Sequence, residues 1–224
     1  MKIAEIFYSV QGEGMLAGVP SVFVRTSGCN LRCTWCDTPY TSWQPEGEER
    51  TFESITDEVN RYRAAHVVIT GGEPMIAPGI AELTRRLDQH ITVETAGTVD
   101  VEVRCDLMSI SPKLANSTPH DRDNGRWAAQ HERLRYQPEI LKRMIGRYPY
   151  QLKFVIADPV DLVEVRGIVK EIQASQDRVL LMPEGVEPRV LAERGGWLVE
   201  ICKQEGFRFS PRLHIELWGN RRGV

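Results

Sequence analysis

Residues 21–36 read SVFVRTSGCNLRCTWC. The first six, Ser21–Thr26, are short, mostly apolar and rich in β-branched residues, which is typical of a buried strand in a parallel sheet. Three cysteines follow at positions 29, 33 and 36. Because the loops after the strands carry the chemistry in parallel α/β folds, this stretch indicates both the class of fold and the place of its functional site.

Further strand-like segments recur along the chain. They are His66–Thr70, Ile91–Thr95, Leu107–Ile110, Gln151–Ile156 and Val179–Met182. Between most of them, apolar residues follow helical spacing, and the clearest stripe runs from Leu162 to Ile172. We expect other helices around Ile55–Tyr62, Ile80–Leu87 and Leu191–Glu205, and a short extended piece near Phe207–Ser210. This alternation predicts parallel βα units.

Six such strands are too few to close an eight-stranded barrel. The predicted fold is therefore α/β, a partial, open, about six-stranded parallel β/α barrel. The chain has 224 residues and shows no repeat or linker, so residues 1–224 are expected to form a single domain. The segment 114–138 is polar and carries four arginines. Such a long connection is unusual, and it is either a solvated surface insertion or a lid or docking surface.

The unusual residues follow the predicted strands, where parallel sheets place their chemistry. The cysteines come after the first strand and Gly71-Gly72-Glu73-Pro74 after the second. Glu94-Thr95 ends the third strand, Ser111-Pro112-Lys113 follows the fourth, and Met182-Pro183-Glu184-Gly185 ends the last. Five segments that lie far apart in the sequence are therefore expected to converge on one rim.

The cysteines Cys29, Cys33 and Cys36 have a spacing that can wrap one face of a 4Fe–4S cube. A cube normally takes four cysteines, and Cys105 and Cys202 sit in unrelated segments, so one iron would stay open for another ligand. Three alternatives remain. They are a structural zinc site, which wants four ligands, a redox dithiol of the last two cysteines, and a ferredoxin-like electron carrier.

Composition narrows the function classes. Lys and Arg number 28 against 31 Asp and Glu, a net charge of −3, which argues against a general nucleic-acid binder. No apolar run approaches the roughly 18 residues of a membrane span, and the N-terminus lacks the apolar core of a signal peptide. We expect a cytoplasmic protein, in which clustered cysteines indicate metal or redox chemistry rather than disulfides.

The Cys-x3-Cys-x2-Cys motif with Trp35 before its last cysteine resembles the radical S-adenosylmethionine superfamily. The Gly71–Pro74 motif resembles that superfamily's second motif. The resemblance implies that S-adenosylmethionine chelates the open iron and is cleaved by an electron from the cluster to yield a 5′-deoxyadenosyl radical. It also implies a reductant protein, such as a flavodoxin or a ferredoxin.

A closer resemblance is to the 7-carboxy-7-deazaguanine synthase family of the queuosine (7-deazapurine) pathway. The matching motifs are residues 5–14 (EIFYSVQGEG), Phe23-Val24-Arg25, Cys36-Asp37-Thr38, Glu94–Thr98 and Ser111-Pro112-Lys113. This resemblance implies a carbon–nitrogen lyase that converts 6-carboxy-5,6,7,8-tetrahydropterin to 7-carboxy-7-deazaguanine with loss of ammonia. It also implies an Mg²⁺ ion and a homodimer.

Site residues follow from these resemblances. The expected S-adenosylmethionine site comprises Trp35, Cys36, Asp37, Gly72, Glu73, Ser111, Pro112, Lys113, Met182, Pro183, Glu184 and Gly185. Thr38 is expected at Mg²⁺, which prefers oxygen ligands. The expected substrate site comprises Val10, Gln11, Gly12, Glu13, Arg25, Thr70, His214 and, by its position in the tail, Asn220. Arg25 suits this role because arginine binds a carboxylate through two parallel hydrogen bonds and lysine cannot.

Two other functions share part of this pattern. A radical-activating enzyme that generates a glycyl radical on a partner protein would have the same cysteine spacing. It would not need Thr38, Arg25 or the Gln11–Gly14 segment. A non-catalytic iron–sulfur electron carrier would not cleave S-adenosylmethionine.

Overall fold

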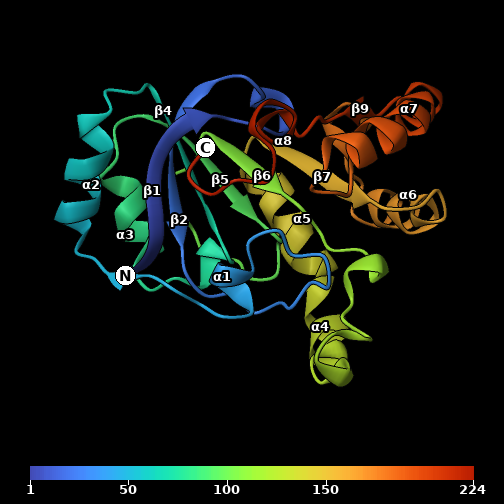
Figure 1. Cartoon of the computed structure of the whole chain (residues 1–224), viewed down its shortest axis with the longest axis horizontal. Coiled ribbons are helices and arrows are strands. Elements are labelled where there is room, and N and C mark those ends of the chain that lie inside the picture. The colour runs from blue at the N-terminus through green and yellow to red at the C-terminus, as the bar shows by residue number, and fades with distance from the viewer.

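A computed structural model describes all residues, 1–224. Its strands form one nine-stranded sheet in the order β3-β1-β2-β4-β5-β6-β7-β8-β9 (Figure 1). The strands are β1 Lys2–Val10, β2 Pro20–Thr26, β3 Glu48–Glu49, β4 His66–Gly71, β5 His90–Thr95, β6 Leu107–Ile110, β7 Tyr150–Ile156, β8 Val179–Pro183 and β9 Arg208–Phe209. From β2 to β9 all neighbours are parallel, whereas β1 pairs antiparallel with β2 and β3.

Eight α-helices connect or flank these strands. They are α1 Pro39–Ser42, α2 Phe52–Arg61, α3 Ile80–Arg85, α4 Ala128–Arg135, α5 Pro138–Arg147, α6 Asp161–Glu171, α7 Pro188–Glu205 and α8 Leu213–Trp218. Single-turn 3-10 helices lie at Gly14–Leu16, Pro74–Ile76, Ala115–Ser117, Arg122–Gly125 and Gln176–Arg178.

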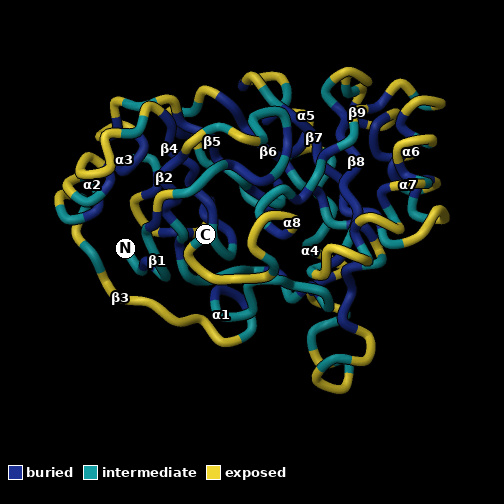
Figure 2. The backbone as a smooth tube through the Cα atoms, turned by 45° about the horizontal axis from the view of Figure 1, so that its top comes forward, coloured by how far each residue is buried: buried dark blue, intermediate teal, exposed yellow.

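The main core lies between the convex face of the sheet and five of these helices. Its 33 buried residues include Val22 and Val24 of β2, Ile69 of β4, and apolar residues of α2, α3, α5, α6 and α7. Side chains alternate between the two faces of a strand, so the residues between them in sequence point to the concave face. A small cluster of Phe7, Phe23 and Val68 lies on that face, on β1, β2 and β4. Figure 2 shows the inner parallel strands, β2 and β4 to β8, as the most buried part of the molecule, whereas the edge strand β3 is exposed.

The open side of the partial barrel is bridged by the segment after β1 and the segment before α8. The Gly14 amide donates to Ser210 Oγ (2.8 Å), the Leu213 amide donates to the Gly12 carbonyl (2.9 Å), and the Met15 amide donates to Gln151 Oε1 (2.7 Å). The first fifteen and last fifteen residues of the chain therefore meet over the concave face.

The predicted fold is confirmed. All six predicted strands are present, and α2, α3, α6 and α7 lie where helical spacing placed helices. The sheet has nine strands rather than about six, because β1 and the two-residue strands β3 and β9 extend its edges. β1 was not predicted because polar and charged residues interrupt its apolar pattern.

The polar segment 114–138 is folded against the cysteine loop. His131 of α4 is buried, with its Nδ1 accepting from the Arg32 amide (3.1 Å) and its Nε2 bonded to Ser117 Oγ (2.9 Å). Arg135 pairs with Glu132 and Glu164. The buried histidine and the paired arginine anchor this segment, and α4 projects from the body of the protein together with the turn before it (Figure 1).

Candidate active site

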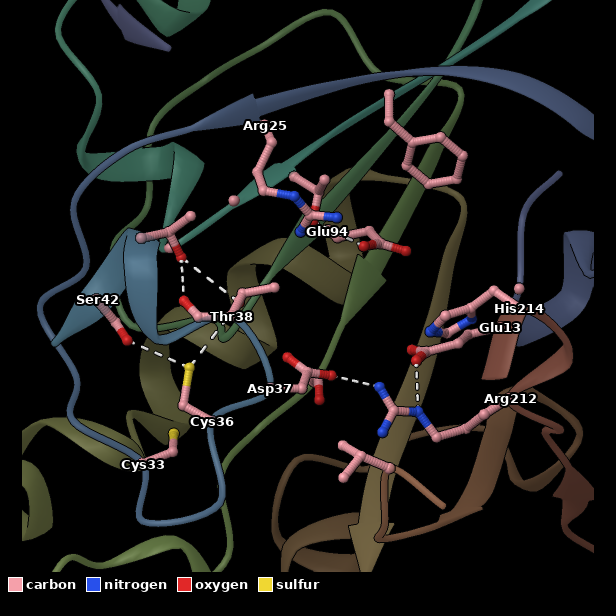
Figure 3. A pocket seen from close by; sticks show the side chains of 18 of the residues that line it. Glu13, Arg25, Cys33, Cys36, Asp37, Thr38, Ser42, Glu94, Arg212 and His214 are labelled. Carbon is pink, nitrogen blue, oxygen red and sulfur yellow. Dashed lines mark hydrogen bonds and ion pairs between the residues drawn. The ribbon is translucent and has the colours of Figure 1, made fainter. Parts of the chain in front are cut away.

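A cavity of about 790 Å³ opens at the carboxyl ends of the parallel strands. It is lined by nearly all of the residues that the sequence singled out: Val10, Gln11, Gly12, Glu13, Arg25, Thr70, Cys29, Cys33, Trp35, Cys36, Asp37, Thr38, Gly72, Ser111, Lys113, Met182, Glu184, Gly185, His214 and Asn220. In Figure 3 the cysteines lie at one end, Glu13, Arg212 and His214 lie at the other, and Asp37 lies between them. The convergence of distant segments that the strand order predicts is therefore present.

Three of the predicted residues lie outside this lining: Glu73, Pro112 and Pro183. The Glu73 carboxylate is buried and accepts from Thr95 Oγ1 (2.7 Å), the Ala96 amide (2.8 Å) and the Met75 amide (3.0 Å). It thereby fastens the loop after β4 to the end of β5. In that loop a Cβ on Gly72 would come 2.1 Å from the Gly28 carbonyl oxygen, so only glycine lets this backbone lie against the cysteine loop.

The cysteine loop is held in shape by hydrogen bonds to its carbonyl and amide groups. Trp43 Nε1 donates to the Cys33 carbonyl (3.0 Å), and the Thr34 amide donates to the Ser117 carbonyl (2.8 Å). All five cysteines of the chain are free thiols. Burial raises the pKa of Cys29 and Cys33 to about 12, so these two thiols keep their protons until a metal displaces them.

This loop suits a cube held at three corners. Cys29, Cys33 and Cys36 all border one cavity, so each can bind a different iron from the same side. No three His, Cys, Asp or Glu side chains are placed to bind one metal ion. A 4Fe–4S cube does not need such a group, because each cysteine binds a different iron. The fourth corner would face the cavity space bordered by Gly72 and Lys113.

The cavity wall beside the cysteines is suited to a zwitterionic ligand. Lys113 Nζ donates to the Ser111 carbonyl and hydroxyl (both 2.8 Å) and lies 6.0 Å from the ring centre of Trp35. Glu184, after β8, pairs with Arg194 of α7. The Lys113 cation, the Trp35 ring and exposed backbone therefore surround the space next to the fourth iron of the proposed cube, which no cysteine would bind.

The concave face carries polar side chains above the Phe7–Phe23–Val68 cluster. Thr70 Oγ1 donates to Glu94 Oε2 (2.9 Å), and Gln11 Nε2 donates to Glu94 Oε1 (3.0 Å). Arg25 Nε donates to Glu5 Oε1 (2.7 Å), and its guanidinium lies 5.7 Å from the ring centre of Phe7. Glu5 and Glu94 were not selected as site residues from the sequence, and both line the cavity.

A chain of charged groups crosses the cavity at its other end. Glu13 pairs with both Lys153 of β7 and Arg212, and Arg212 also pairs with Asp37 (Figure 3). Burial alone would raise the pKa of the Glu13 carboxyl, but the two cations hold it well below its usual range. Arg212 likewise lowers the pKa of Asp37 against the effect of burial.

Sequence reasoning missed both Arg212 and Lys153. Lys153 carried a usable signal, because a lysine in the middle of a buried apolar strand needs a partner. Arg212 carried none, since its partners Glu13 and Asp37 lie 199 and 175 residues away.

Thr38 lies at the start of α1 with its hydroxyl largely free. Its Oγ1 makes only long contacts, 3.5 Å to Thr41 Oγ1 and 3.9 Å to Cys36 Sγ. An oxygen in this position can still bind a ligand in the cavity.

The C-terminal segment closes over the cavity. A Cβ on Gly12 would come 2.0 Å from His214 Nδ1, so the imidazole lies directly on the Gln11–Glu13 backbone. Burial lowers the pKa of His214, which favours the neutral ring. Beyond α8, Arg222 lies 4.1 Å from the ring centre of Tyr40 and pairs with Glu5 and Glu46. The tail 220–224 thereby lines the cavity.

Comparison with known proteins places this chain in a family. The family described as Radical SAM superfamily matches residues 23–135, just over half of the chain. A protein of Rhodopirellula baltica named 7-carboxy-7-deazaguanine synthase is 45% identical over 99% of this chain and 88% of its own length. The chain belongs to the 7-carboxy-7-deazaguanine synthase family.

Other members of this family agree. A 7-carboxy-7-deazaguanine synthase of Halobacterium salinarum is 44% identical over 98% of this chain and 91% of its own length. The crystal structure of QueE from Escherichia coli superposes with a TM-score of 0.67 at 25% identity, covering 93% of this chain and 92% of that one. Membership of the radical S-adenosylmethionine superfamily implies a 4Fe–4S cluster and S-adenosylmethionine. No helix of the structure is long and apolar enough to cross a membrane.

Proposed function

We propose that this chain is a lyase that converts 6-carboxy-5,6,7,8-tetrahydropterin to 7-carboxy-7-deazaguanine, releasing ammonia, in 7-deazapurine formation. The observation that carries the proposal is the single cavity. It joins the three-cysteine loop to a concave face that offers Arg25, Glu94 and Gln11. Substrate and product differ by one ammonia only, so the conversion needs no net oxidant.

The cluster and S-adenosylmethionine would occupy the cysteine end of the cavity, where together they supply a radical that abstracts hydrogen. Cys29, Cys33 and Cys36 would hold three irons. Gly72, Ser111 and Lys113 would meet the methionine moiety, with Trp35, Met182 and Gly185 along the rest of the cofactor. Lys113 can pair with the cofactor carboxylate through a proton not already donated to Ser111.

The pterin would lie over the Phe7–Phe23–Val68 cluster. Glu94 is fixed by Gln11 and Thr70 and can accept from the N–H groups of the pterin edge. Arg25 uses its Nε for Glu5 and keeps its terminal N–H groups for the substrate carboxylate. Val10, Gly12, Glu13, His214 and Asn220 would complete the substrate site, in which the side chains orient the ring and the closed tail excludes water.

Thr38 is proposed as a ligand of Mg²⁺. A threonine hydroxyl and a substrate carboxylate together offer the hard oxygens that Mg²⁺ prefers, and water can fill the remaining positions. The free Thr38 hydroxyl between the cysteines and the concave face supports this placement.

A reductant protein such as a flavodoxin or ferredoxin, a homodimeric assembly and a cytoplasmic location complete the proposal. A reducing compartment agrees with five free thiols.

The deciding experiment is product analysis after anaerobic cluster reconstitution. The reduced enzyme is incubated with S-adenosylmethionine, with and without the carboxypterin. Stoichiometric ammonia and 7-carboxy-7-deazaguanine are expected only when the pterin is present. Cleavage of S-adenosylmethionine without deazaguanine would refute the substrate. Formation of a glycyl radical on an added partner protein would point to the radical-activating alternative, and absence of any cleavage would point to an electron carrier.

A further inference from the structure

Three arginines and two tryptophans gather on the outer side of the cysteine loop, away from the cavity. We call Arg32, Trp43, Arg122, Arg126 and Trp127 the Arg–Trp patch. The Arg122 guanidinium lies 4.0 Å from the ring centre of Trp43, and those of Arg32 and Arg126 lie 5.0 and 5.2 Å from Trp127. These residues line a hollow of about 650 Å³ together with Pro39, Gln44 and Asp123. None of the patch residues has a part in the proposed chemistry.

The patch is joined directly to the backbone that carries the cysteines. Trp43 Nε1 donates to the Cys33 carbonyl (3.0 Å), Arg122 donates to the Thr34 carbonyl (2.9 Å), and Arg32 donates to the Cys29 carbonyl (2.7 Å). A group seated on the patch is therefore separated from the cysteine ligands by one layer of side chains and the loop backbone.

The positive charge of the patch is not neutralised by ion pairs. Arg32, Arg122 and Arg126 form no salt bridge with any carboxylate. The one carboxylate in the hollow, Asp123, accepts from Trp127 Nε1 (3.1 Å). In a chain of net charge −3, this local excess favours an acidic partner, and Arg and Trp are the residue types that contribute most binding energy at protein interfaces.

We propose that the Arg–Trp patch docks an acidic one-electron carrier protein, from which the electron enters the cluster through the outer side of the cysteine loop. The inference rests on the proposed function, since only a cluster that turns over needs repeated reduction. The carrier loses one electron and the oxidised cluster gains it, and no bond or proton is exchanged. On the other side of the loop, His214 of α8 and the tail 220–224 line the cavity, and the cofactor and the substrate would fill that space.

The test compares charge reversals on and off the patch. Arg126→Glu is the first variant, because Arg126 contacts only Trp127 within the patch, and Arg122→Glu is the second. The matched control is Arg189→Glu on α7, an exposed arginine without an ion pair that lies outside the patch. The probe is a strongly acidic flavodoxin with bound FMN.

Two readouts are needed. Binding of the flavodoxin is measured from quenching of tryptophan fluorescence at low and moderate salt. Cluster reduction is measured with flavodoxin hydroquinone and, separately, with dithionite. We expect Arg126→Glu to weaken binding by about tenfold or more at low salt and to flatten its salt dependence. The control should bind as the wild type does, and all variants should react equally with dithionite.

Unchanged flavodoxin binding in both patch variants would overturn the proposal, as would equal weakening in the control. Binding of an RNA oligonucleotide that is lost in Arg126→Glu, with flavodoxin binding unaffected, would overturn it in favour of a nucleic-acid site. If dithionite-reduced wild-type enzyme makes no deazaguanine, the proposed function fails independently of the docking result.

Discussion

Polar side chains are buried at both ends of the concave face, and the two groups differ in kind. Near the start of the parallel strands, Ser21, His66 and Thr92 are almost fully buried. The imidazole bonds to Ser21 Oγ (2.6 Å) and Thr92 Oγ1 (2.8 Å). At the carboxyl ends the groups are ionic: Glu13, Lys153, Asp37 and Arg212.

The difference shows that buried polar side chains serve different purposes at the two ends of the parallel strands. The neutral group satisfies its own hydrogen bonds and borders neither of the two cavities described above, so its role is to hold β2, β4 and β5 together. The ionic group borders the cavity and links segments that carry the proposed cofactor and substrate sites. In parallel α/β folds the same contrast separates the stabilising end of the strands from the catalytic end.

The largest effect is expected from the cysteine loop. Cys29→Ala, Cys33→Ala and Cys36→Ala should each abolish the cluster, from about four irons per chain to essentially none, because a cube cannot be held by two thiolates. Iron analysis and the visible spectrum after anaerobic reconstitution measure this. Cys202→Ala, a buried cysteine in the main core, should keep its iron. Stoichiometric zinc without an iron-dependent spectrum would contradict the cluster.

Arg212→Met should have the next largest effect. It removes the cation between Glu13 and Asp37, and breaking a buried ion pair from one side costs about 3–5 kcal/mol. Urea unfolding should show this loss. Glu13 keeps Lys153, so folding at low temperature should survive, with product formation lost. A variant with wild-type stability and turnover would show that the ionic group is needed for neither, which would contradict the contrast drawn between the two ends of the strands.

Arg25→Ala should lower kcat/KM for the carboxypterin by an amount equivalent to about 2–5 kcal/mol, roughly 30- to several-thousand-fold. Arg25→Lys should restore this only partly, since a point charge cannot reproduce the planar fork. Cleavage of S-adenosylmethionine without product should continue, because Arg25 lies on β2 before the cysteine loop. Ammonia and 5′-deoxyadenosine are measured side by side, and equal loss of both would place Arg25 elsewhere in the mechanism.

The neutral end predicts a pH effect on stability. Burial, aided by His90, lowers the pKa of His66 to about 4 from an ordinary value of 6.5. Between these values the unfolded chain binds a proton that the native state excludes. Stability is therefore fully present above pH 6.5 and falls as the pH is lowered towards 4, by on the order of 3 kcal/mol.

His66→Gln, which can still bond to Ser21 and Thr92, should lessen this decline. Unfolding midpoints at pH 7 and pH 5 measure it, with turnover at pH 7 close to wild type. A background decline should remain from His131, whose pKa is also lowered to about 4 by burial. A large loss of turnover at unchanged stability would show that the neutral end also serves catalysis.

The smallest effect is expected from Thr38→Ala. It removes one oxygen among several around the proposed Mg²⁺, so the metal concentration for half-maximal turnover should rise by roughly tenfold with the iron content unchanged. A Mg²⁺ titration of product formation measures this. An unchanged response would move the metal away from Thr38.

The strand positions could be predicted from the sequence because their signals are local, and most of the residues that line the cavity could be identified through motifs that resemble those of a known family. An apolar, β-branched run such as that of β4 predicts a strand whatever the strand packs against. The three cysteines lie close together in the sequence, so their spacing describes a single loop. The Glu13–Arg212 pair joins opposite ends of the chain, and no local pattern reports such a contact. Arg25 shows the same limit, because its type predicted a carboxylate partner but not that Glu5 already occupies its Nε.

The bridge between the Gln11–Gly14 segment and α8 has a consequence for the order of folding. The Gly12 carbonyl accepts from the Leu213 amide, and Glu13 pairs with Arg212, 199 residues away in the sequence. Contacts between residues so far apart in the sequence form late, because the entropy of closing a long loop opposes them until the intervening chain is ordered. The sheet can therefore form first, and the substrate end of the pocket should be completed last.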